Sequence, residues 1–261
     1  MIHQFFNQKK LLLFVATVYA MTANATAQDI TQPVDLTFIE RWEELDKNIS
    51  ETRSKSGHWL LGEYDFDSRG FNVLHFMGAS AFPGGFRIWG LLDIEGIDHL
   101  ATQREDLSRY FLEIDIKRAL YKNVGVVAEL NDLTGDNNAI GRFGFFWTPD
   151  TSFLSNFGGW WLTGDFKFGI KAFPYETDGE GGQFSFNWNK NFENILGGRI
   201  SAGGFFDLNL NAGPMNDSTV IVTEHQIRLR FFDNIHLITE FRWNQFLAAD
   251  FGVAPGIQYR Y

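Results

Sequence analysis

The last eleven residues of the chain alternate strictly between two kinds of side chain. From Phe251 to Tyr261, every second position is apolar or aromatic, and the positions between them are small or polar. Successive side chains of a β-strand point to opposite faces, so the segment predicts a strand with one apolar and one polar face. Such a strand can lie at the edge of a soluble sheet or can face lipid on its apolar side.

The same period of two recurs through most of the sequence. About eleven earlier segments alternate in this way and, with the last one, predict about twelve strands. The clearest is Tyr110 to Lys117, where apolar residues alternate with charged ones. The earlier segments are residues 60–66, 71–82, 86–95, 110–117, 124–130, 140–147, 162–172, 183–189, 199–210, 219–231 and 237–243.

The composition of the two faces favours a strand wall surrounded by lipid. About twelve strands with bulky inner residues would overfill a closed soluble barrel, whose interior side chains already fill at about eight strands. Two packed sheets remain another way to bury these residues. Aromatic residues make up 16% of the chain, yet the mean hydropathy is only −0.17, as expected of strands that are apolar on one face. We therefore predict an all-β fold, a transmembrane antiparallel up-and-down β-barrel of about twelve strands.

The connections alternate between the two ends of this barrel. Residues 96–106 are expected to form a loop, and residues 148–157 a loop with one helical turn capped by Asp150 or Thr151. One set of turns falls on the same side as both termini, which predicts that this side faces the periplasm: residues 82–85, 119–123, 148–158, 190–198 and 232–234.

The N-terminal residues differ from the strand region. Residues 1–27 have the basic pair, short apolar run and small-residue cleavage sites of a signal peptide. Residues 28–57 carry apolar positions at helical spacing over 35–51 and predict a periplasmic helix with a linker, although a plug within the barrel stays open as an alternative. The barrel is then residues 58–261, and the bacterial outer membrane is the expected location.

Charge and cysteine content exclude several functions. The chain has 22 Lys and Arg against 32 Asp and Glu, a formal net charge of −10, which argues against nucleic acid as a partner. It has no cysteine, so disulfides and thiolate metal sites are excluded. No cofactor is predicted, and the expected partners are outer-membrane lipid and a small-molecule solute.

Charged and aromatic residues on the polar parity are the candidates for solute contact in the lumen. Acids and bases are mixed there, which suits neutral polar solutes better than phosphate or acidic sugars, which need an excess of cations. Flat rings on this parity, including Trp161, could stack a sugar or a base, although they could equally be ordinary wall residues. The predicted lumen residues are Trp89, Asp93, Glu113, Asp115, Lys167, Phe205, Arg228, Arg230, Glu240 and Arg242.

Two other classes of outer-membrane barrel compete with a channel. An outer-membrane lipid hydrolase or protease would need a catalytic histidine, but none sits in a recognisable nucleophile motif. His75 and Ser80 lie on opposite parities, and His236 with Glu240 is better explained as a hydrogen-bonded lumen pair. We therefore predict no catalytic residues and no enzyme. A closed structural or adhesion barrel is the other alternative, and short outward loops argue against adhesion.

Three strand motifs carry a resemblance to a known family. Residues 85–95 (GFRIWGLLDIE), 110–117 (YFLEIDIK) and 182–192 (GQFSFNWNKNF) resemble segments of the nucleoside-specific channel-forming porins of outer membranes (Tsx-like, including the OmpK group). The C-terminal Gly-x-x-Tyr-x-Tyr pattern also fits, and it resembles the signal through which the barrel-assembly machinery would engage Tyr259 and Tyr261. The resemblance implies a monomeric twelve-stranded barrel that passes nucleosides, with Trp89 and Asp93 in the matching strand. The segment 28–57 departs from the family pattern.

Overall fold

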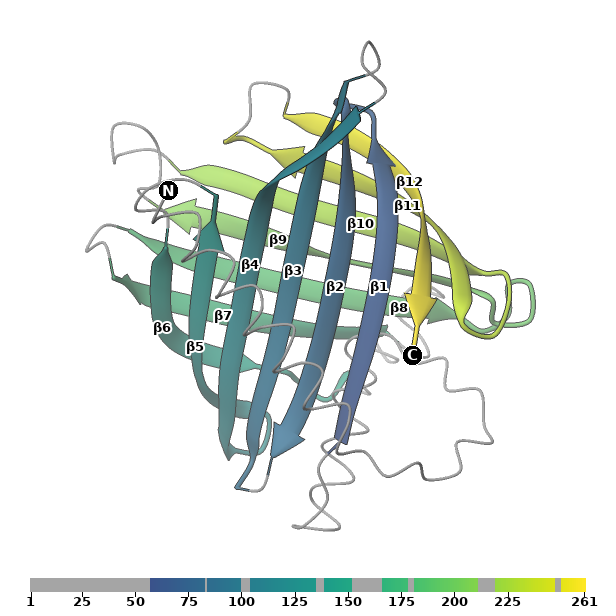
Figure 1. Cartoon of the computed structure of the whole chain (residues 1–261). Coiled ribbons are helices and arrows are strands. Elements are labelled where there is room, and N and C mark those ends of the chain that lie inside the picture. The colour runs from purple at the N-terminus through teal and green to yellow at the C-terminus, as the bar shows by residue number, and fades with distance from the viewer. Residues whose placement is uncertain are drawn as a thin grey trace.

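The computed structural model describes residues 57–82, 84–99, 104–134, 139–151, 166–177, 181–210, 219–246 and 250–261. Within these ranges the chain forms a closed barrel of twelve antiparallel strands, each paired with its sequence neighbours (Figure 1). The barrel closes between the first and last strands, where Leu61 lies opposite Arg260 and Asp65 opposite Gly256. The predicted signal peptide, nearly all of the segment 28–57 with its predicted helix, and Trp161 lie outside the described residues.

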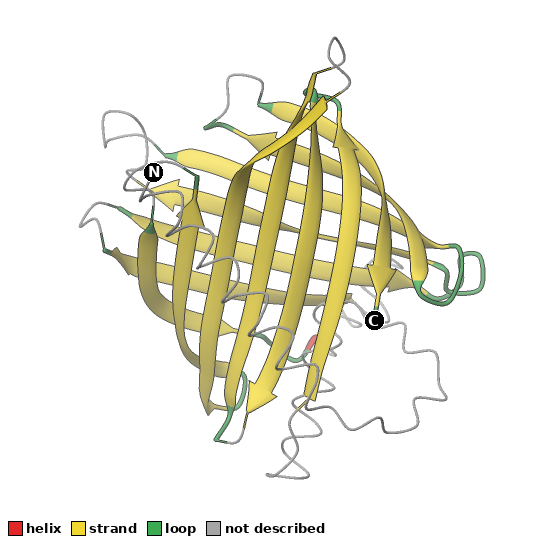
Figure 2. Ribbon diagram, in the orientation of Figure 1, coloured by secondary structure: helices red, strands yellow, loops and turns green. Residues whose placement is uncertain are grey.

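Strands account for nearly all of the described chain (Figure 2). No helix in this part of the chain is long and apolar enough to cross a membrane. The strands are β1 (Gly57–Asp67), β2 (Phe71–Phe82), β3 (Phe86–His99), β4 (Arg104–Tyr121), β5 (Val124–Leu133), β6 (Ile140–Trp147), β7 (Phe166–Glu176), β8 (Gly182–Phe192), β9 (Ile200–Leu210), β10 (Val220–Arg230), β11 (Ile235–Asn244) and β12 (Phe251–Arg260).

The predicted fold class and all twelve predicted strands are confirmed, but the loop expected at residues 96–106 is wrong. There β3 continues to His99 and β4 begins at Arg104, so the two strands pair almost to the tip of the hairpin. A register shift between Glu95 and Gly96 changes which residues face each other. Glu95 pairs with Arg109 and Gly96 with Leu107, so Ser108 of β4 is an extra residue, which interrupts the period of two in β4 without ending the ladder. The helical turn expected within 148–157 lies almost wholly outside the described residues.

Alternate residues of each strand point inward and outward, and the outward parity is the apolar one. In β6, Phe145 is 56% exposed on the outer surface, whereas Arg142 on the inner parity is only 9% exposed. Soluble proteins place charged side chains outside and apolar ones inside, and this barrel reverses that arrangement. The outer surface therefore suits a hydrocarbon environment, and the strand lengths of 8 to 18 residues suffice to cross one at a tilt.

The closing seam between β1 and β12 contains one interruption. In an antiparallel sheet, the backbone N–H and C=O of successive residues face the two neighbouring strands in turn. Val253 of β12 faces Ser68, the residue that follows β1: Ser68 N donates to Val253 O, and Val253 N donates to Ser68 Oγ, both at 2.9 Å. Pro255, two residues on, therefore faces β1 as well and has no N–H to offer. Ser68 restores the seam beyond that missing donor.

Candidate functional site in the barrel lumen

The register places every predicted lumen residue on the inward parity of its strand. Trp89 of β3 lies opposite Asp115 of β4, and Phe205 of β9 lies opposite Glu224 of β10. The strands that contribute the remaining predicted residues are β3 (Asp93), β4 (Glu113), β7 (Lys167), β10 (Arg228 and Arg230) and β11 (Glu240 and Arg242). The orientation of these side chains is thus as expected, and their contact with a solute stays a prediction.

Arg242 stands at the centre of one ionic cluster, formed by β1, β2 and β11. Its Nη2 lies 2.7 Å from Asp65 Oδ2 and 3.0 Å from His75 Nε2, and its Nη1 lies 3.3 Å from Asp67 Oδ2. Its Nε donates to Glu240 on the same strand. A guanidinium presents five donors in a fixed fork, so Arg242 can hold carboxylates from several strands together. We call this group, with its neighbours on β3, β10 and β12, the Arg242 cluster.

Amide side chains extend the Arg242 cluster across strands that are not neighbours in the sheet. Gln226 Nε2 of β10 donates to Glu63 Oε1 of β1 at 2.9 Å and to Glu240 Oε2 at 3.0 Å. Gln258 Nε2 of β12 donates to the other Glu63 oxygen at 2.6 Å. Because β10 and β1 are separated by two strands in the sheet, these bonds cross part of the lumen and do not follow the wall.

Lys171 of β7 is the centre of a second cluster. Its Nζ lies 2.5 Å from Glu129 Oε2, 3.2 Å from Asp115 Oδ2 and 3.4 Å from Glu113 Oε1. Arg142 of β6 adds a second cation, with Nη1 2.8 Å from Glu129 Oε1. β4 and β7 are separated by two strands, so the Lys171 cluster also reaches across the interior. Asp115 and Glu129 are buried and Glu113 is half-buried, and contact with a cation offsets the cost of removing these charges from water.

Charge is segregated along the barrel axis. The lumen looked evenly mixed in the sequence, but basic residues gather at the end where the chain enters β1 and leaves β12. Arg228 in this zone donates to Asn189 Oδ1 at 2.7 Å and to Ser201 Oγ at 3.2 Å. The carboxylates lie mainly in the middle and toward the other end, where Arg142, Lys171 and Arg242 are paired with them. The basic inward residues near the strand ends are Arg87, Lys117, Lys167, Arg228, Arg230 and Arg260.

Trp89 belongs to an apolar patch inside the barrel. It packs with Met77 against Trp59, Leu61 and Ala79, all on the inward parity of β1 and β2. The sequence reasoning did not include Trp59 and Leu61 among lumen residues, although they share the parity of Glu63 and Asp65. That shared parity was the signal that could have identified them.

The ionic partners in the two clusters were also missed as site residues. They include Glu63, Asp65, His75, Glu129, Arg142 and Lys171. Their polar parity indicated that they face inward, but which charges meet across the lumen depends on strand positions around the barrel. Glu240 was expected to pair with His236, but its hydrogen bonds go to Gln226 and Arg242. His75 and Ser80 lie on opposite faces, as predicted.

A closed antiparallel barrel with an apolar outer surface and a charged interior is a transmembrane β-barrel, the class that spans bacterial outer membranes. No family model and no curated protein matches the sequence, so the resemblance to nucleoside-specific channels is not confirmed.

Several porins are among the solved structures similar to this chain. They include the KdgM porin (TM-score 0.48, 11% identity, covering 78% of this chain and 99% of that one) and the NanC porin (TM-score 0.47, 9% identity, 76% and 97%). A mutant of the Rh. blastica porin is a further match (TM-score 0.36, 8% identity, 79% and 100%). At these identities the likeness concerns the fold alone.

Proposed function

We propose that this protein is a monomeric outer-membrane channel through which small neutral polar solutes diffuse passively, with nucleosides as the first candidates. The observation that carries the proposal is that the barrel has a charged interior and an apolar outer surface. A twelve-stranded barrel lies between small barrels filled by side chains and wide porins, so its passage would be narrow and selective. Its residues act by binding and orienting a solute, and the proposal assigns no chemical step to them.

The segregation of lumen charge supports a neutral solute. An anion would be attracted by the basic end but would then meet a zone in which carboxylates outnumber their partners Arg142, Lys171 and Arg242. A cation would be repelled at the basic end before it reached those carboxylates. A neutral solute with hydrogen-bonding groups crosses both zones without either barrier. The distribution of lumen charge thus favours the same class of solute as the resemblance to nucleoside channels.

The inward aromatic residues support nucleosides within that class. Trp89 lies beside Asp115, and Phe205 lies between Asn187 and Glu224 of the adjoining strands. A ring of this kind can stack on a base, while neighbouring carboxylate and amide groups can bond to ribose hydroxyls. These groups would therefore bind a solute strongly enough for it to enter the channel and weakly enough for it to leave, as conduction requires.

Planar-bilayer recording of the folded protein tests the proposal. We expect discrete conductance steps that millimolar adenosine or uridine reduces and that equimolar ribose 5-phosphate reduces less. Conductance that no nucleoside affects would remove the nucleoside assignment and leave a general channel. Heat-modifiable migration on a gel must first show that the protein is folded. An absence of current can then be attributed to a closed barrel and not to unfolded protein.

A closed barrel is the second candidate, and the two ionic clusters favour it. Both reach across the interior, and their central residues Asp65, Asp115 and Arg242 are almost wholly buried. Side chains that bridge the lumen would narrow or block a passage. A folded barrel that gives no conductance above an empty bilayer would support this candidate and contradict the channel.

The assembly partner is proposed from the C-terminal strand. Tyr259 and Tyr261 are exposed on the outer surface, where the barrel-assembly machinery could reach them. Replacing Tyr261 by Ala should lower the yield of folded protein in outer membranes more than the yield of refolding into detergent. Equal losses in both settings would indicate a structural role only.

A further inference from the structure

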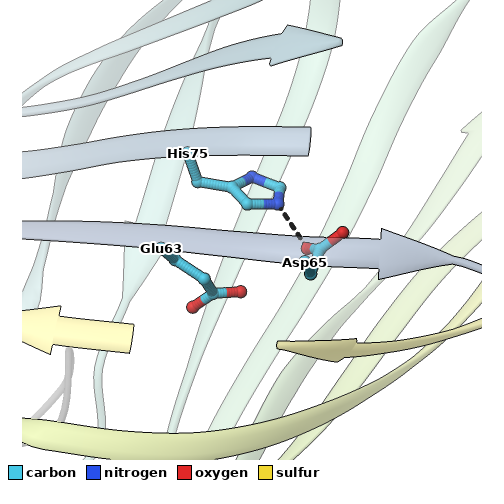
Figure 3. Close-up of side chains that lie close together, drawn as sticks. All are labelled: Glu63, Asp65 and His75. Atoms are coloured by element: carbon cyan, nitrogen blue, oxygen red, sulfur yellow. Dashed lines mark hydrogen bonds and ion pairs between the residues drawn. The ribbon is translucent and has the colours of Figure 1, made fainter. Parts of the chain in front are cut away.

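We propose that Glu63, Asp65 and His75 form a binding site for a divalent transition-metal ion, with Zn²⁺ as the preferred occupant (Figure 3). The two carboxylates come from β1 and the imidazole from β2. Each residue offers one ligand atom, and these atoms all lie within 4.8 Å of one another. The site does not depend on the barrel being a channel, and it would stand if the barrel were closed.

The sheet register brings the three side chains together. Glu63 and Asp65 are two residues apart on one strand, so both point into the lumen. His75 lies directly opposite Glu63 on the neighbouring strand and shares that face. The side chains are 2%, 0% and 5% exposed in the order Glu63, Asp65, His75, so a bound ion would be shielded from competing water.

The imidazole is held in the orientation that a metal ligand needs. His75 Nδ1 lies 2.6 Å from Asp93 Oδ1 on β3, and its Nε2 faces Asp65 Oδ2 at 2.7 Å. In metalloproteins a carboxylate on one ring nitrogen commonly fixes the tautomer and leaves the other nitrogen for the metal. A neutral His75 that donates from Nδ1 to Asp93 directs the lone pair of Nε2 at the carboxylate of Asp65. Arg242 Nη2, 2.7 Å from Asp65 Oδ2 and 3.0 Å from His75 Nε2, relieves that repulsion here, and a metal ion at the same two atoms would take its place.

The buried carboxylates around the site outnumber the positive groups that contact them. Among the described residues, Asp65 Oδ1 has no hydrogen-bond partner, although Asp65 is fully buried. Arg242, Arg69 and, when protonated, His75 are the positive groups that contact these acids, and the carboxylates outnumber them. The carboxylates of the Arg242 cluster are Glu63, Asp65, Asp67, Asp93, Glu224 and Glu240. A buried excess of negative charge is costly unless a cation offsets it.

The Lys171 cluster provides an internal comparison. Glu113, Asp115 and Glu129 also offer ligand atoms within 4.8 Å of one another. There the Lys171 ammonium lies within 3.4 Å of all three carboxylates, whereas in the proposed site Arg242 lies against Asp65 and His75, two of the three ligands. That trio also lacks an imidazole. It should therefore bind no transition metal, and its variants serve as controls.

The donor set decides which ion fits. One imidazole nitrogen with two carboxylates suits Zn²⁺ and its neighbours in the first transition series, whereas Ca²⁺ and Mg²⁺ prefer oxygen ligands alone. Arg242 lies against both Asp65 and His75, so metal binding would have to displace its Nη2. Arg242 competes with the ion, and its removal should tighten binding.

Calorimetric titration of the folded, chelator-treated barrel with Zn²⁺ tests the site, with Co²⁺ absorption as a spectroscopic probe of imidazole ligation. We expect one equivalent of Zn²⁺ to bind, and His75→Asn or Asp65→Asn to abolish it. Asp93→Asn keeps all three ligands and should weaken binding by about 10- to 100-fold. Glu113→Gln, in the Lys171 cluster, should bind as the parent does, and Arg242→Gln should bind more tightly.

Three outcomes would overturn the site: no saturable Zn²⁺ binding by the parent, unchanged binding by His75→Asn, or equal loss in Glu113→Gln and Asp65→Asn. Heat-modifiable migration identifies the variants that fold. If His75→Asn does not fold, Asp93→Asn decides, because unchanged affinity in that variant contradicts the orientation of His75 on which the site depends.

Discussion

Trp188 Nε1 donates a hydrogen bond to His225 Nδ1 at 3.3 Å on the outer, lipid-facing surface of the barrel. The indole and the imidazole come from β8 and β10, and Gly204 of β9 lies between them in the register. His225 Nε2 lies 3.0 Å from Thr223 Oγ1, and that hydroxyl donates to Phe205 O at 2.6 Å. Each side-chain polar group in this series of hydrogen bonds thus has a partner, which lipid could not supply.

Gly204 makes that arrangement possible, so replacing it should be costly. A Cβ at this position would lie 2.1 Å from Glu224 O and 2.5 Å from His225 Nδ1. We expect Gly204→Ala to lower the free energy of unfolding by about 2–3 kcal/mol, measured by urea titration of the refolded barrel. Gly62→Ala is the matched control, because Gly62 also faces outward in a strand and nothing lies within 4 Å of its added Cβ. Equal stability of the two variants would contradict the close approach.

Lys171 should be among the most sensitive positions of the interior. Lys171→Gln removes the cation that lies against Glu113, Asp115 and Glu129. Breaking a buried pair leaves uncompensated charge, and we expect a loss of about 3–5 kcal/mol in the free energy of unfolding. Adding Glu129→Gln to this variant should recover part of the loss, because Glu129 makes the shortest of the three contacts. A double variant no more stable than Lys171→Gln would argue against direct pairing.

Alternation alone was sufficient to predict the strands and the face that each residue occupies. Tyr110 to Lys117 could be assigned because each position has a well-defined parity, and lipid on one side enforces it. The hairpin of β3 and β4 could not be followed to its end, because the extra residue Ser108 changes the parity of β4 while pairing continues. A period of two therefore locates strands within the membrane better than it locates their ends.

The lumen site was less predictable than the fold, for a geometric reason. Parity assigns Lys171 and Asp115 to the interior but carries no information about their distance across it. Their contact depends on how β4 and β7 curve around the barrel, which follows from closure of the whole sheet. The segregation of charge along the axis was visible in principle, because the order of turns gives the end at which each residue lies.

Trp89 links the interior packing to the proposed function. Its ring packs in an apolar patch with Trp59 and Leu61, so Trp89→Ala should cost about 3 kcal/mol in the free energy of unfolding. If the ring also stacks on solute, the same variant should lose nucleoside block in bilayer recordings while single-channel conductance rises or stays the same. Leu61→Ala controls for the packing effect, since it removes an apolar neighbour without removing a stacking surface. Loss of block in both variants would assign the effect to the patch and not to the Trp89 ring.

Ser68 should contribute to closure of the barrel although it lies in a turn. Its Oγ accepts from Val253 N at 2.9 Å, next to the place where Pro255 offers no donor to β1. Ser68→Ala leaves that N–H without its side-chain acceptor, and we expect about 1 kcal/mol of lost stability. Ser68→Thr keeps the hydroxyl and should restore it. Hydrogen exchange at the Val253 amide locates the effect: exchange should quicken in Ser68→Ala and not in Ser68→Thr. Unchanged protection in Ser68→Ala would mean that the seam is held by the remaining pairs from Leu61 to Asp65 alone.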